Sequence, residues 1–180
     1  NREVNLRNLR LLSAGLEQSP TSVVITDTDG AIEYVNPKFV EMSGYDRDVV
    51  LGENPRILKS GTTSDETYKE LWETVLGGRA WSGTFENKKD DDTPYHVAAS
   101  ISPIFNKDGQ IASLIGIQED ITEKKRMQEE LEKLATTDGL TGVFNRSYFM
   151  DCFNREIRRA VRYELPLTVL AFDLDYFKNV

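Results

Sequence analysis

Cysteine and histidine are almost absent from this 180-residue chain, which has one of each, Cys152 and His96. A single cysteine excludes an internal disulfide, and the two residues together are too few for a zinc-ligand cluster. A reducing compartment, the cytoplasm, is therefore the expected location. The chain also lacks an apolar run long enough to cross a membrane and lacks a signal peptide. It begins without an initiator methionine, so a longer parent protein with a membrane segment upstream remains an open alternative.

Positive charge is scarce as well. The chain has 22 Lys and Arg residues against 30 Asp and Glu residues, which gives a net charge of -8. This balance argues against nucleic acid as a partner, because binding phosphates requires a basic face. The remaining composition, 39 % apolar and 29 % charged, is that of a globular protein with one or two domains.

The first 19 residues predict an amphipathic helix. Apolar side chains recur at helical spacing, and the helix is expected to end before Pro20, because the residue before a proline avoids helical geometry. Two roles stay open for this helix: it covers a face of the domain that follows, or it forms a dimer contact. The apolar residues are Val4, Leu6, Leu9, Leu12 and Leu16.

Residues 20–121 predict an α+β domain with an antiparallel sheet. The segments SVVITDTDG and AIEYVN form a hairpin about Asp29-Gly30, and short helices follow from Asn36-Pro37. A longer helix is expected from Thr63 to Gly77. Three more strands are expected, and they bring the sheet to five strands with the helices gathered on one face. These strands span Trp81–Asn87, Tyr95–Phe105 and Ile111–Glu119.

Residues 122–137 predict a second exposed helix, with Thr122 as a candidate cap. Its apolar residues, Met127, Leu131 and Leu134, form a narrow seam between charged neighbours. Such a seam fits a short parallel coiled coil, so a homodimer through this helix and the N-terminal helix is expected. An ordinary solvated linker helix is the alternative, since the seam lasts only about two heptads.

The last part of the chain predicts a helix from Ser147 to about Tyr163 and then an apolar strand, LTVLAFDLD. A continuous apolar strand is typical of one buried on both faces of a sheet. The chain supplies no neighbouring strands for it, so residues 138–180 are not expected to complete a core of their own.

Two motifs now suggest a family. The segment D-I-T, a charged helix and T-D-G-L-T-G-V-F-N-R resemble the junction between a PAS sensor domain and a GGDEF domain, the family that makes cyclic di-GMP from GTP. Upstream, ITDTDGAIEYVNPKFVEMSGYDRDVVLGENPRIL resembles the strands and small helices of PAS domains. The resemblance implies a PAS domain at 20–121, a signalling helix at 122–137 and a truncated α/β GGDEF start at 138–180. The GGDEF match rests on Asp138, Leu140, Thr141, Gly142, Asn145 and Arg146, with Val143 in place of the usual Leu.

The PAS part looks like the flavin-binding branch of its family, shared by light-sensing LOV domains and flavin redox sensors. This resemblance implies FAD or FMN as cofactor. By the same resemblance, Asn87 and Gln118 bond the edge of the flavin ring, and Asn54 and Arg56 lie near the flavin and its phosphate. Trp81 matches the tryptophan that packs beside the ring in redox-sensing members.

Two residues depart from the LOV pattern. Pro55 stands where LOV domains carry the cysteine that attacks the photoexcited flavin, and Val97 stands where they carry a second amide. Adduct photochemistry is therefore excluded, and a redox sensor is expected. Haem is not expected, because His96 lies on a strand and not on the long helix, and it is expected to be exposed. An empty PAS domain remains the alternative.

The FDLDYFK stretch resembles the first catalytic strand of GGDEF domains. The resemblance implies that Asp173 and the Leu174 carbonyl hold Mg²⁺, and that the N–H groups near Tyr176 and Phe177, with Lys178, hold the substrate phosphates. An acidic strand end that caps the next helix would be the simpler interpretation of D-x-D alone.

Together these features suggest the sensory region of a bacterial diguanylate cyclase that joins two GTP molecules and is controlled by a PAS ligand or redox state. The glycine-rich signature hairpin is not within the 180 residues. The chain itself is therefore expected to be inactive and to bind GTP weakly. Two alternatives stay open: a ligand-free PAS dimerisation module, and a parent whose GGDEF domain is degenerate and only binds GTP as a regulator.

Overall fold

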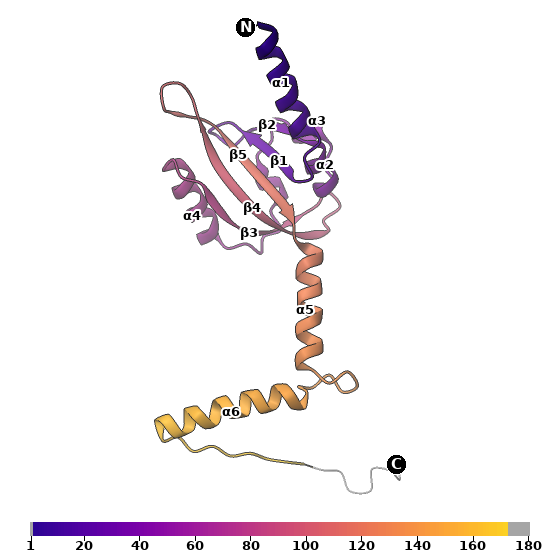
Figure 1. Ribbon diagram of the computed structural model, residues 1–180, viewed down its shortest axis with the longest axis vertical. Helices are drawn as coiled ribbons and strands as arrows, with labels where there is room; N and C mark the ends of the chain where they lie inside the picture. The colour runs from indigo at the N-terminus through magenta and orange to yellow at the C-terminus, as the bar shows by residue number, and fades with distance from the viewer. Residues whose placement is uncertain (1, 173–180) are drawn as a thin grey trace. The chain divides into compact units, whose positions relative to one another are not determined.

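The computed structural model of the protein describes residues 2–172, without the side chains of Arg2 and Asn5 (Figure 1). The chain divides into two compact units, Asn1–Lys125 and Arg126–Val180, which are described separately below.

The first unit is built on a five-stranded sheet. Its order is β2-β1-β5-β4-β3, and each pair of neighbours is antiparallel (Figure 1). The β1–β2 turn is closed by the Asp27 carboxylate, which accepts hydrogen bonds from the N–H groups of Asp29 and Ala31. Gly30 in this turn has φ +87°, which glycine adopts without strain. The strands are Ser22–Thr26 (β1), Ile32–Val35 (β2), Trp81–Lys88 (β3), Pro94–Phe105 (β4) and Ile111–Asp120 (β5).

Helix α1 precedes the sheet, and the other helices of this unit lie between β2 and β3 in the chain and pack against the sheet. Pro37 opens α2 at a position where its missing N–H costs nothing, and the Ser64 hydroxyl caps α4 by accepting from the Thr67 N–H. The predicted five-stranded antiparallel sheet with helices is confirmed. The helices are Arg2–Glu17 (α1), Pro37–Ser43 (α2), Arg47–Val50 (α3), the 3₁₀ helix Pro55–Leu58 (η1) and Asp65–Leu76 (α4).

The core lies between one face of the sheet and the helices. Alternate residues of each strand point inward, so β4 buries Tyr95, Val97 and Ala99 while His96 lies on the opposite face. His96 is half-buried rather than exposed as predicted. Two apolar clusters fill the core, one centred on Val97 and Phe85 and the other on Val35 and Phe39.

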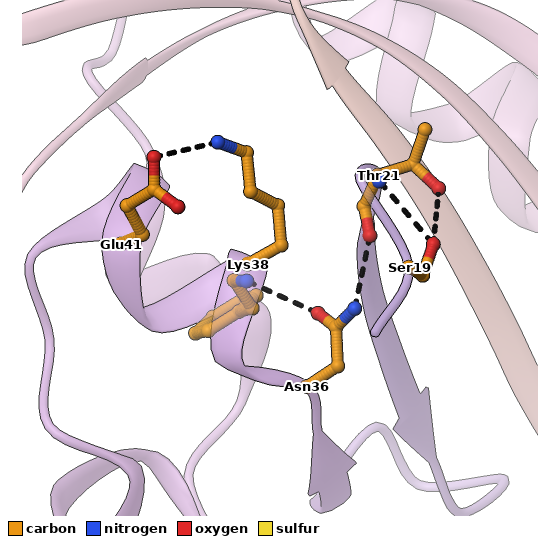
Figure 2. A network of polar contacts seen from close by, with 6 residues as sticks. Ser19, Thr21, Asn36, Lys38 and Glu41 are labelled. Carbon is orange, nitrogen blue, oxygen red and sulfur yellow. Dashed lines mark hydrogen bonds and ion pairs between the residues drawn. The ribbon is translucent and has the colours of Figure 1, made fainter. Parts of the chain in front are cut away.

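Asn36 joins the end of α1 to the domain, and Figure 2 shows its contacts with Thr21 and with the first turn of α2. Its side chain is fully buried, and its oxygen accepts from the N–H groups of Val23 and Phe39. Its amide nitrogen donates to the carbonyl oxygens of Leu16 and Thr21. One side chain therefore holds α1, β1 and α2 together.

Helix α5, Thr122–Thr136, begins directly after β5. Thr122 is its first residue, and its hydroxyl accepts from the His96 N–H at 2.8 Å. The Thr122 N–H donates to the Asp120 carboxylate. The sequence predicted Thr122 as a helix cap, whereas the structure uses its hydroxyl to join the helix start to β4.

In the second unit, α6 spans Arg146–Tyr163, close to the predicted helix. No residue described between 126 and 172 is buried. The predicted strand from Leu167 is wrong for residues 167–172, which have no regular structure and are exposed. A strand that is apolar on both faces forms only against neighbours, and the described chain has none for it. Among residues 2–172, no helix is long and apolar enough to cross a membrane.

Candidate cofactor site

A cavity of about 350 Å³ lies in the first unit between the sheet and the helices. Its volume falls in the lower part of the usual range for ligand sites. Most of its wall is apolar, and a few polar side chains interrupt it. The main apolar and aromatic lining residues are Val24, Leu58, Tyr68, Leu71, Phe85 and Leu114.

Two buried amides line the cavity from the sheet. Asn87 on β3 is 5 % exposed, and Gln118 on β5 is 6 % exposed. The Gln118 Oε1 atom is buried and has no hydrogen-bond partner within the described residues. A buried amide without a partner is costly, and a polar ligand would relieve that cost. The structure thus brings Asn87 and Gln118, both predicted from the sequence, to one cavity.

The segment around η1 forms another part of the lining. Asn54, Pro55 and Arg56 all line the cavity, and the Asn54 side chain accepts from the Arg56 N–H at 3.1 Å. An added Cβ on Gly30 would lie 2.5 Å from the Asn54 Nδ2 atom, and with its φ of +87° this position favours glycine where the turn meets η1. Arg56 is exposed, and its guanidinium group places a positive charge at the cavity, which suits the binding of a phosphate.

Lys59 supplies a second cation that the sequence reasoning missed. It also lines the cavity, and its Nζ lies 3.4 Å from the centre of the Tyr68 ring. A cation over an aromatic face is attracted by the electrons of the ring. The only sequence signal for Lys59 was its position close to Arg56 in the chain.

Trp81 is placed differently from its prediction. It is 5 % exposed, is not part of the cavity lining, and stacks on Phe85 with ring centres 5.1 Å apart. Its indole covers Gly83, where an added Cβ would come within 2.4 Å of the ring. The aromatic residues that do line the cavity are Tyr68, Trp72 and Phe85, and the rings of Tyr68 and Phe85 stack with their centres 5.5 Å apart. The sequence signal for Tyr68 was its place on the apolar face of α4.

Tyr95 lies deep in the core beside this site. It is 1 % exposed, and its hydroxyl has no hydrogen-bond partner among the described residues. Burial raises the pKa of Tyr95 to about 12, and the neighbouring Asn87 amide offsets part of that rise. Val97 is fully buried next to it, so this part of the wall has no second amide.

The D-G-L-T-G-V-F-N-R motif forms a closed turn in the second unit. The Asp138 carboxylate accepts from the Thr141 hydroxyl and from the N–H groups of Leu140 and Thr141, and these bonds hold the pKa of Asp138 below its ordinary value. Asn145 caps α6 through the Tyr148 N–H and donates to the Ala135 carbonyl oxygen in α5. In this structure the motif joins two helices.

The expected magnesium and phosphate residues lie outside the described part of the chain. They are Asp173, Leu174, Tyr176, Phe177 and Lys178, and their roles stay predictions. Within residues 2–172, no group of three or more acidic, histidine or cysteine residues is placed to hold a metal ion.

Curated relatives match stretches of different length in this chain. The chain is 32 % identical over 121 residues to a nitrogen fixation regulatory protein of Klebsiella oxytoca, which covers 67 % of this chain and 24 % of that protein. It is 25 % identical over 166 residues to the cyclic di-GMP phosphodiesterase PdeB of Shewanella oneidensis, which covers 92 % of this chain and 19 % of that protein. The chain thus spans about a quarter or less of the length of these curated relatives.

Solved structures agree on the fold. An RNA-binding light-oxygen-voltage receptor matches with a TM-score of 0.64 and 25 % identity over 71 % of this chain and 36 % of that one. The LOV domain of a blue-light activated histidine kinase of Erythrobacter litoralis matches with a TM-score of 0.55 and 27 % identity over 58 % of this chain and 99 % of that one.

Family models match the chain in two places. The model described as PAS domain matches residues 20–123, more than half of the chain, and the model described as diguanylate cyclase, GGDEF domain, matches residues 135–180. The chain therefore belongs to the PAS domain family, and the start of a GGDEF domain follows its PAS domain.

Proposed function

We propose that the PAS domain binds a flavin, FAD or FMN, and senses redox state. The observation that carries the proposal is the cavity of about 350 Å³, in which two buried amides, one on β3 and one on β5, lie in a mostly apolar wall. A flat ring system with polar atoms along one edge suits such a site, because its faces contact apolar side chains while its edge bonds the amides. The light-oxygen-voltage neighbours support this choice.

The chain's own residues would have distinct tasks. Asn87 and Gln118 bond the ring edge, and Arg56 and Lys59 hold the phosphate at the cavity. Tyr68 and Phe85 pack against the ring faces. Bound flavin supplies reversible electron transfer. Pro55 has no thiol, so light-driven attachment of the flavin to this residue is excluded.

The absorption spectrum tests the proposal directly. We expect the protein, as purified or after refolding with FAD or FMN, to show the two visible and near-ultraviolet bands of an oxidised flavin, which dithionite bleaches. Gln118→Ala should weaken binding about tenfold, the loss expected for one ligand hydrogen bond. Gln110→Ala, in the exposed β4–β5 turn, is the matched control and should bind normally. A wild-type protein that stays colourless with both flavins refutes the proposal.

For the parent protein, we propose a diguanylate cyclase whose activity depends on how two copies meet. The GGDEF match and the PAS domain before it support this, since such a cyclase must bring two GTP molecules together. A redox change in the cavity would act by favouring one packing of α5 over another. We expect the 180-residue chain to make no cyclic di-GMP from GTP and Mg²⁺. Product formation by this chain would contradict that.

A second candidate, a ligand-free dimerisation module, is favoured by the exposed apolar residues of the helices. Met127, Leu131 and Leu134 on α5 are 55 %, 67 % and 69 % exposed, and leucines of α1 are similarly exposed. A row of exposed apolar side chains along one face of a helix is typical of a helix–helix interface. A colourless protein that still forms dimers would identify this function. Whether a degenerate GGDEF domain serves as a GTP sensor depends on the parent's remaining catalytic residues.

A further inference from the structure

Asn87 and Tyr95 face each other across two strands. They are direct partners in the β3–β4 register, so both side chains point to the cavity side of the sheet. Both are buried, but only Asn87 lines the cavity. Tyr95 therefore lies behind the amide, as seen from a ligand.

The Tyr95 hydroxyl lacks a partner in its surroundings. Tyr95 belongs to an apolar cluster that includes Met42, Val97 and Leu114, none of which accepts its proton. The hydroxyl has no hydrogen-bond partner among residues 2–172. Asn87 is the direct cross-strand neighbour of Tyr95 on the same face of the sheet. An adjustment of the Asn87 side chain is therefore the simplest way to give the hydroxyl a partner.

The two orientations of the amide differ in what they leave unpaired. An amide oxygen turned toward Tyr95 accepts the hydroxyl proton, so the donor is paired and only lone pairs remain free. An amide nitrogen turned toward Tyr95 leaves the buried O–H proton without an acceptor. Buried donors without acceptors are rarer and more costly than acceptors that are only partly used. The first orientation is thus the more stable one.

We propose that Tyr95 is a positioning residue, whose hydroxyl donates to Oδ1 of Asn87 and thereby turns the Asn87 NH₂ group toward the cavity. The site then offers donors at this wall and selects a ligand edge that carries acceptors, such as carbonyl oxygens or unprotonated ring nitrogens. The inference rests on the proposed function in taking Asn87 as a ligand contact. The orientation itself is a property of the ligand-free protein.

The first test is nuclear magnetic resonance of the ligand-free 180-residue chain. Asn87→Ala identifies the side-chain amide signals of Asn87 by their loss. Tyr95→Phe, which removes only the hydroxyl, should shift those signals. Tyr34→Phe is the matched control: its hydroxyl bonds Glu17 away from the cavity, so the Asn87 signals should stay in place. Asn87 signals that are unchanged in Tyr95→Phe overturn the inference.

The second test is a double-mutant cycle on the affinity for FMN and FAD. Tyr95→Phe should weaken binding about tenfold when Asn87 is present, and should have no effect in the Asn87→Ala background. Equal losses in both backgrounds would mean that Tyr95 acts only on core packing, which refutes the positioning role. If the wild-type protein binds neither flavin, the proposed cofactor is wrong, whereas the resonance test still decides the orientation of Asn87.

Discussion

Asn36 connects several segments of backbone through one buried polar side chain. Its four hydrogen bonds reach the end of α1, the start of β1 and the first turn of α2. All four bonds are to backbone groups near the core, and of these the Phe39 N–H and the Leu16 carbonyl oxygen also have a backbone partner. Such groups are expensive to leave unpaired when water cannot reach them.

We therefore expect Asn36→Ala to lower the free energy of unfolding by about 3 kcal/mol. Urea unfolding followed by circular dichroism measures this value. Asn106→Ala is the control, because that amide also bonds two backbone N–H groups but lies in an exposed turn. The control should lose less than about 1 kcal/mol, and equal losses would argue against the junction role of Asn36.

Tyr95 makes the folding stability of the protein fall at alkaline pH. Burial raises its pKa from 10.0 to about 12, so the native state keeps a phenol proton that the unfolded chain has already released. The contribution is complete below about pH 10 and is lost as the pH rises through the native pKa. The expected slope is about 1.4 kcal/mol per pH unit in that window.

Urea unfolding of wild type and Tyr95→Phe from neutral pH to above about pH 11 isolates this contribution. The stability difference between the two proteins should change in favour of the phenylalanine variant as the pH rises. Lysines titrate in the same range, but they titrate in both proteins and cancel in the difference. A difference that does not vary with pH would show that the hydroxyl is not buried in solution.

At the scale of elements, helix α5 is joined to the sheet at its first residue. The Thr122 hydroxyl bonds the His96 N–H of β4, and the Asp120 carboxylate bonds the Thr122 N–H. The first helical bond, from the Lys125 N–H to the Ile121 carbonyl oxygen, forms just beyond this junction. The junction thus determines where the helix begins.

Thr122→Val keeps the shape of the side chain and removes its hydroxyl. We expect hydrogen exchange at the Lys125 amide to become about tenfold faster, because the first turn of α5 loses its attachment to β4. Thr136→Val at the other end of α5 removes an exposed hydroxyl that bonds only its own helix, and should leave Lys125 unaffected. Unchanged exchange in Thr122→Val would contradict the junction role.

A substitution in the apolar seam of α5 tests whether two copies of the chain meet at this helix. Leu131→Glu places a charge in the seam and should convert a dimer into a monomer in analytical ultracentrifugation. Lys133→Gln changes the net charge by the same amount on the other side of the helix, and should stay dimeric. A wild-type protein that is monomeric at high concentration would exclude the interface.

Within residues 2–172 the protein has one core, and that core belongs to the first unit. Every buried apolar residue that the structure describes lies between Val23 and Leu114, and none of the residues described in 126–172 is buried. We expect trypsin to cleave first in α5 and α6 and to leave a resistant fragment that retains the sheet. That fragment should unfold at the same urea concentration as the full chain. Early cleavage within β1–β5 would contradict this division.

The sequence predicted the strands and the longer helices closely, because alternation, turn residues and helical periodicity are local signals. Asn87 and Gln118 were found by resemblance, and the strand register brings both to the cavity. The packing of Trp81 behind Phe85 was not predictable, since only the tertiary structure decides which of two nearby aromatic rings faces the cavity. The strand predicted at residues 167–172 was wrong for the opposite reason. The local apolar pattern was clear, but the neighbouring strands that such a strand requires were missing among the described residues.

The sheet order also explains how the domain is connected to its surroundings. Strands β1 and β5 are antiparallel neighbours, and Ser22, near the end of α1, pairs with Gln118, near the start of α5. The chain therefore enters and leaves the domain at adjacent points, at the same end of these two inner strands (Figure 1). A domain with this entrance and exit can be inserted into a helical protein, or exchanged for a relative, without changing the path of the chain on either side. What an exchange has to preserve is the number of residues between each helix and its strand, because each added residue rotates the helix by about 100°.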